Sequence, residues 1–150
     1  MTLHVYSARV SYGGADRLDV TRKSATGFAL AFAPSFRLLG DGLAARRHID
    51  AAERSGLALA QGNAMAEDAV RRVAEASRAE AWEQYRAAYI EEMRRSYARQ
   101  RTAWGWLLTQ TEQVTLVCYC TDATRCHRRV LAGLLAACGA VDCGERGDGR

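Results

Sequence analysis

The sequence has few of the features that would place it in a special class of protein. Proline occurs once, no low-complexity segment is visible, and the 49% hydrophobic and 25% charged residues are ordinary globular proportions. No apolar run approaches the roughly 20 residues that span a bilayer, and residues 1–10 lack the basic and apolar regions of a signal peptide. We therefore expect a cytoplasmic, soluble domain that does not contact a membrane.

Lysine is almost absent. Lys23 is the only lysine among 21 basic residues, and the chain contains 28 alanines. Both biases are typical of proteins encoded by a GC-rich genome. The formal net charge of +4 favours phosphate-bearing partners, but no contiguous basic run marks a nucleic-acid surface. Because an ammonium is a compact point charge that a guanidinium does not imitate, Lys23 is a candidate anion-binding residue.

Paired cysteine knuckles are also missing. The chain has five cysteines, and Cys118, Cys120 and Cys126 lie too close together for a spread disulfide framework. The spacing argues against zinc as well, so reduced thiols and no metal or other cofactor are expected. Cys118 and Cys138 are expected in the core, and whether Cys120 and Cys126 form a redox pair stays open.

What is present is an alternation of strand and helix patterns. Strands are expected at 3–9, 17–21, 114–120 and 140–143, and helices at 35–39, 82–99 and 125–138. This order predicts a single three-layer α/β domain over residues 1–143, with a small, mostly parallel sheet of about four strands covered by helices. Residues 43–79 lack a clean apolar stripe and are expected to be a variable helical insertion, and 144–150 a flexible tail.

One helix carries a regular aromatic stripe. Tyr85, Tyr89, Met93 and Tyr97 recur every four residues, which places them on one face of the helix expected at 82–99. Aromatic and methionine residues at this spacing are more often core than ligand contacts. We expect the stripe to pack against the sheet.

The residues that could carry chemistry are concentrated between the strand at 114–120 and the helix that follows it. A helix N-terminus at the carboxyl end of a parallel strand offers amides and a positive partial charge to anions. With Thr124 as N-cap, the first helical turn holds Cys126, His127 and Arg128. The helix would lower the pKa of the Cys126 thiol, His127 would move a proton, and Arg128 would hold a phosphate or carboxylate.

The ends of the other strands are expected to open onto the same edge of the sheet. Asp19 could orient one of the cations there, and the remaining candidate binding residues are Ser7, Arg9, Lys23, Ser24, Cys120 and Thr124. The pattern predicts a domain that binds or acts on a phosphorylated metabolite, a nucleotide or a nucleic-acid component. Whether it is an enzyme stays open.

Several of these segments resemble the domain-of-unknown-function 488 family, in the branch common in bacteriophages and prophages. They are Tyr6–Arg9, Arg17–Ser24, Phe32–Ser35, Met93–Tyr97 and Val114–Arg128. The resemblance implies an α/β domain with a Cys-His-Arg signature after a central strand, at Cys126, His127 and Arg128, and it marks Asp19 in a strand-end motif. The family has no settled activity, so the alternative is a phage-encoded adaptor that binds a host protein or DNA without catalysis.

Overall fold

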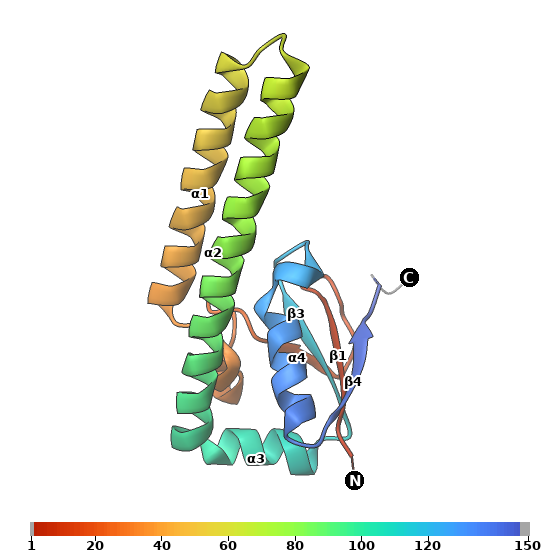
Figure 1. Ribbon diagram of the computed structural model, residues 1–150. Coiled ribbons are helices and arrows are strands. Elements are labelled where there is room, and N and C mark those ends of the chain that lie inside the picture. Colours follow the sequence, from red (N-terminus) through yellow and green to blue (C-terminus); the bar gives the residue numbers. More distant parts are fainter. Residues whose placement is uncertain (1, 148–150) are drawn as a thin grey trace. The chain divides into compact units, whose positions relative to one another are not determined.

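The computed structural model describes residues 2–147, and its chain forms two compact units. One unit combines the segments before residue 36 and after residue 88 and contains the whole sheet. The other is a helical hairpin over Phe36–Ala88 (Figure 1). Among the described residues, no helix is both long and apolar enough to cross a membrane.

A four-stranded parallel sheet is the centre of the first unit, which confirms the predicted α/β class. The strands are β1 (His4–Arg9), β2 (Arg17–Asp19), β3 (Gln113–Cys118) and β4 (Val141–Glu145), in the order β2-β3-β1-β4. Each neighbouring pair is parallel. β3 is buried on both faces, as its run of apolar residues predicts.

The connector from β1 to β2 is short for a parallel crossover. It suffices because β2 enters the sheet opposite Thr115, inside β3 rather than at its start. The Asp16 carboxylate ties the connector to β3, since it accepts hydrogen bonds from Tyr12 Oη (2.7 Å), Gln113 Nε2 (2.8 Å) and Thr115 Oγ1 (2.7 Å). Burial would raise the pKa of Asp16, but these hydrogen bonds outweigh it and hold the pKa below its ordinary value of 3.8.

Because of Asp16, the free energy of unfolding should depend on pH in the acidic range. A carboxyl with a lowered pKa in the folded state stabilises the protein above its unfolded pKa and loses this effect as the pH falls through its folded pKa. We expect Asp16→Asn to lower the free energy of unfolding by about 1–3 kcal/mol at neutral pH, and the difference to shrink below about pH 4. Urea unfolding at several pH values measures this, and a difference that stays constant down to pH 3 would contradict it.

The first two α-helices are longer than the sequence pattern predicts, and the last one is slightly shorter. The helices are η1 (Gly27–Phe32), α1 (Phe36–Leu59), α2 (Ala64–Arg99), α3 (Arg101–Gln110), η2 (Ala123–Arg125) and α4 (His127–Ala137). The end expected for the helix at 35–39 is wrong, because Gly40 and Gly42 do not stop the helix but lie inside α1. A glycine costs a helix only about 1 kcal/mol, and a Cβ at Gly42 would lie 3.0 Å from the Tyr85 ring of α2, so the glycine allows the close approach of the two helices.

The helical hairpin is formed by α1 and the first part of α2. The turn between them contains Gly62, whose φ of +83° favours glycine, and Asn63, whose side chain accepts a hydrogen bond from the Ala66 amide. Arg78 bridges the two helices by pairing with Asp50 (2.9 Å) and Glu53 (2.8 Å). Both helices extend beyond the expected insertion at 43–79, and the variability of that segment stays a prediction.

A polar and aromatic cluster joins η1 to the end of α2 and to α3. Tyr89 Oη donates to the Phe32 carbonyl oxygen (2.7 Å), Ser96 Oγ donates to a neighbouring carbonyl of η1, and Trp104 Nε1 donates to Ser96 Oγ (3.0 Å). The Phe32 and Trp104 rings pack at 4.9 Å. Within the aromatic stripe of α2 only Tyr89 and Met93 are fully buried, since Tyr97 is 46% exposed.

The first residues of the segment expected to be a tail belong to β4 or bond to the sheet. β4 continues to Glu145, and the Arg146 amide donates to the Ser7 carbonyl oxygen (2.6 Å). The Arg146 guanidinium lies 3.7 Å above the centre of the Tyr6 ring. The rest of the expected tail, residues 148–150, lies outside the described residues.

Candidate functional site

The loop after β3 begins and ends differently from the prediction. β3 stops at Cys118, so Cys120 lies in the loop, and α4 begins at His127 with Cys126 as its N-cap. The expected N-cap Thr124 is wrong: its amide and hydroxyl donate to the Asp122 carboxylate at 2.9 and 2.6 Å. Asp122 therefore caps the short turn η2 before the helix starts, because an aspartate carboxylate readily accepts from the amide two residues ahead.

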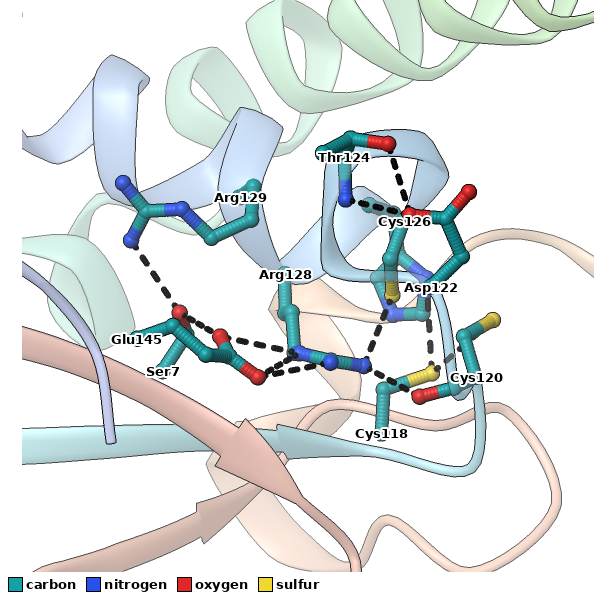
Figure 2. Close-up of polar contacts among 10 residues, drawn as sticks. Ser7, Cys118, Cys120, Asp122, Thr124, Cys126, Arg128, Arg129 and Glu145 are labelled. Atoms are coloured by element: carbon teal, nitrogen blue, oxygen red, sulfur yellow. Dashed lines mark hydrogen bonds and ion pairs between the residues drawn. The ribbon is translucent and has the colours of Figure 1, made fainter. Parts of the chain in front are cut away.

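A cluster of three thiols is the main feature of this loop (Figure 2). The sulfurs of Cys118, Cys120 and Cys126 all lie within 4.8 Å of one another. Cys118 Sγ lies 3.8 Å from Cys120 Sγ. Cys118 and Cys126 are 4% and 1% exposed and Cys120 is half-buried, so the thiol cluster reaches the surface on the Cys120 side. The other two cysteines, Cys138 and Cys143, are exposed, which corrects the expected core position of Cys138.

The pKa values of two thiols in the cluster lie above the ordinary value, whereas the sequence predicted a lowered pKa for Cys126. The Cys118 thiol, together with the Cys120 thiol and burial, raises the pKa of Cys126 instead of lowering it. The Cys120 thiol likewise raises the pKa of Cys118 to about 11. Negative charges on adjacent thiols repel one another, and this repulsion together with burial outweighs the helix N-terminus. Cys126 is therefore buried, and the pKa of its thiol lies above the ordinary value.

Arg128 is fully buried and already paired. Its Nε and Nη2 groups donate to Glu145 Oε1 at 3.2 and 2.7 Å, and Nη1 donates to the Cys120 carbonyl oxygen (2.7 Å) and to Cys126 Sγ (3.4 Å). Figure 2 shows its guanidinium between Glu145 and the thiol cluster. Arg128 thus positions the loop rather than holding a phosphate. Sequence reasoning missed Glu145 because it falls in the segment expected to be a tail.

His127 is also held inside the protein. Its Nε2 lies 2.8 Å from the Val20 carbonyl oxygen and its Nδ1 3.8 Å from Cys118 Sγ. Because a carbonyl oxygen only accepts, Nε2 carries the proton and Nδ1 faces the thiol unprotonated. Burial lowers the pKa of His127, which keeps the ring neutral. The expected proton transfer to a ligand is therefore not supported; His127 joins the end of β2 to the thiol cluster.

Ser7 lies deeper than the expected binding edge. It is buried within β1, and its hydroxyl donates to Glu145 and accepts from Arg129 (3.1 Å). Arg129 pairs in turn with Asp142 of β4 (2.7 Å). Ser7 therefore holds Glu145, the acidic member of the Arg128–Glu145 ion pair, through a hydrogen bond (Figure 2).

The end of β2 forms a second polar cluster beside the thiols. The Asp19 carboxylate accepts hydrogen bonds from the hydroxyls of Thr21 (2.6 Å) and Ser24, and Tyr119 Oη from the other loop donates to Ser24 Oγ (3.2 Å). Burial would raise the pKa of Asp19, but these hydrogen bonds lower it. Asp19 thus organises its own loop, and that it also orients one of the cations at this edge stays a prediction.

Residues 59–139 match the family model DUF488-N3a, described as the active DUF488-N3 subclade, over more than half of the chain. The chain belongs to the DUF488 family. The matched range contains the whole thiol cluster, α4 and residues 59–79 of the segment expected to be an insertion, while β1, β2 and β4 lie outside it. No curated protein and no solved structure matches this DUF488 chain.

Proposed function

We propose that this DUF488 domain binds a phosphorylated small molecule or a nucleotide at the carboxyl edge of its sheet. One observation carries the proposal: the carboxyl ends of three parallel strands lie side by side. In the register of the sheet, Arg9 at the end of β1 lies opposite Cys118 of β3, and Asp19 at the end of β2 lies opposite Val117 of β3. Open parallel sheets bind their ligands outside the carboxyl ends of the strands. The loops that follow these ends carry the hydroxyl, thiol and basic side chains described above.

The charge at this edge supports an anionic ligand. Arg9 and Lys23 are exposed there, and the carboxylate of Asp19 is engaged by hydroxyls of its own loop. The hydroxyls of Ser24 and Tyr119 are hydrogen-bonded to each other at the surface between the two clusters and offer further contacts to phosphate oxygens. Because Arg128 is paired with Glu145, we assign phosphate recognition chiefly to the exposed Lys23, with Arg9 adding positive charge at the same edge.

The proposal concerns binding and names no reaction. The phage origin and the cytoplasmic location expected from the sequence stay predictions. The alternative, an adaptor for DNA or a host protein, gains nothing from the helical hairpin, where Arg71, Arg72 and Arg78 pair with acidic side chains of the same hairpin. These pairs neutralise part of the positive charge that a nucleic-acid surface would need.

Removing the charge of Lys23 should weaken anion binding. We expect Lys23→Ala to bind AMP, ADP or GMP more weakly than the unaltered chain by about 1–3 kcal/mol, because a charge-assisted hydrogen bond is lost. Lys23→Arg should recover only part of the affinity, since the bulkier guanidinium does not reproduce a point charge. Isothermal titration calorimetry of each nucleotide, and of inorganic phosphate, measures the difference.

Arg94→Ala is the matched control for this experiment. Arg94 is an exposed basic residue on α2 that pairs with Glu91, so its removal changes the net charge equally without touching the sheet edge. It should leave the affinity unchanged. Equal weakening by Lys23→Ala and Arg94→Ala, or no binding of any probe by the unaltered chain at millimolar concentration, would refute the proposed site.

A further inference from the structure

The thiol cluster has the dimensions of a metal site. In tetrahedral zinc–thiolate sites the Zn–S bonds of about 2.3 Å place the sulfurs about 3.8 Å apart. Cys118 Sγ and Cys120 Sγ are separated by 3.8 Å, and both lie within 4.8 Å of Cys126 Sγ. The three sulfurs therefore need little movement to ligate a single ion.

The thiol cluster is held by hydrogen bonds of the kind that orient metal ligands. Arg128 Nη1 donates both to Cys126 Sγ and to the Cys120 carbonyl oxygen, which fixes two of the three cysteines, and Glu145 holds the guanidinium from the other side. Metal ligands are commonly oriented by such outer hydrogen bonds. A disulfide would use only two of the thiols and would require sulfurs about 2.05 Å apart, so it explains neither the third thiol nor the arginine.

The geometry points to a zinc ion bound by Cys118, Cys120 and Cys126, with its fourth position open on the half-buried Cys120 side. Thiolate ligands favour zinc among the common divalent ions. Three protein ligands and an open position are typical of zinc sites that take a water molecule or a substrate. Binding would release the thiol protons to solvent, and the cation would remove the repulsion that keeps the free thiols protonated.

This inference goes beyond the proposed ligand site and does not depend on it. The zinc content can be measured without any nucleotide, and the affinity for nucleotides can be measured in Lys23→Ala, which leaves every thiol in place. Zinc without nucleotide binding would refute only the proposed function. Nucleotide binding without zinc would refute only the metal site.

The decisive experiment is metal analysis of the full chain, purified under reducing conditions with zinc supplied. We expect about one zinc per chain by elemental mass spectrometry. Cobalt added to the zinc-free chain should give the near-ultraviolet sulfur-to-cobalt charge-transfer band that reports thiolate ligands. Well under one zinc per chain with fully reduced thiols, stoichiometric copper or iron instead of zinc, or a disulfide between two of the three cysteines would each overturn the assignment.

Cysteine variants locate the metal. Cys120→Ser, at the half-buried position that is least critical for folding, should weaken zinc binding at least about 100-fold, with circular dichroism confirming the fold. The exposed Cys138 and Cys143 provide matched controls, and Cys138→Ser and Cys143→Ser should keep the zinc and the cobalt band. Unchanged zinc affinity in a folded Cys120→Ser, or its loss in both control variants, would show that the ion is bound elsewhere.

Discussion

Arg128→Ala should lower the free energy of unfolding by about 2–5 kcal/mol. The guanidinium is completely buried, and its removal takes away the ion pair with Glu145, whose side chain is 30% exposed, and the hydrogen bond to the Cys120 carbonyl oxygen. Because the whole guanidinium is buried, its loss also leaves a cavity beside the loop. Urea unfolding, followed by tryptophan fluorescence, measures the loss.

The neighbouring arginine provides the control. Arg129 also forms an ion pair with a β4 residue, Asp142, but the side chains of that pair are 27% and 28% exposed. Arg129→Ala should therefore cost about 1 kcal/mol or less. If both variants lose the same stability, Arg128 has no special role in holding the loop. We expect Arg128→Lys to have a stability between those of the unaltered chain and Arg128→Ala. The ammonium keeps the charge but lacks the planar guanidinium, which binds Glu145 and the loop at once.

The second large effect is expected at Phe32, which lies at the end of η1 and is fully buried against the Trp104 ring at 4.9 Å. Phe32→Ala should cost about 3–5 kcal/mol, because it removes the ring and leaves a cavity under α3. The loss should appear as a shift of the urea midpoint without a change of slope.

Phe28 tests whether burial, rather than aromatic content, sets this cost. It belongs to the same short helix and contacts the Trp106 ring at 4.8 Å, yet it is 41% exposed. Phe28→Ala should cost about 1 kcal/mol, since much of its surface stays in water in the folded protein. A loss as large as that of Phe32→Ala would contradict this account of the packing.

The class of the fold follows from patterns that are local in the sequence. The apolar run of β3 and the apolar spacing of α4 identify a buried strand followed by an amphipathic helix, and both are present within two residues of the expected bounds. Only residues 35–39 of α1 and 82–99 of α2 were assigned to regular helices, because α1 contains Gly40, Gly42 and Gly56 and because residues 43–79 lack a clean apolar stripe. A helical hairpin such as this one needs only small residues at its contacts and shows no strong amphipathic stripe.

The composition of the candidate site was recognised, but its internal geometry was not. Sequence reasoning placed Cys120, Cys126, His127 and Arg128 in one loop, and the structure brings them together there. It could not show that Cys118 turns toward the same point, because a cysteine at the end of an apolar strand is indistinguishable from a core residue. Glu145 was missed because it is distant in sequence and lies on an edge strand with few apolar residues.

The sequence by itself determined the parallel α/β class, the position of the chemical loop between β3 and α4, and membership of a family through its motifs. Only the tertiary structure decided what the residues of that loop do. Packing against β4 pairs Arg128 with the Glu145 carboxylate, so the guanidinium is not available to a ligand. The neighbouring Cys118 and Cys120 thiols, together with burial, raise the pKa of Cys126 instead of letting the helix N-terminus lower it. These outcomes depend on distances between segments far apart in the chain, which local sequence patterns do not contain.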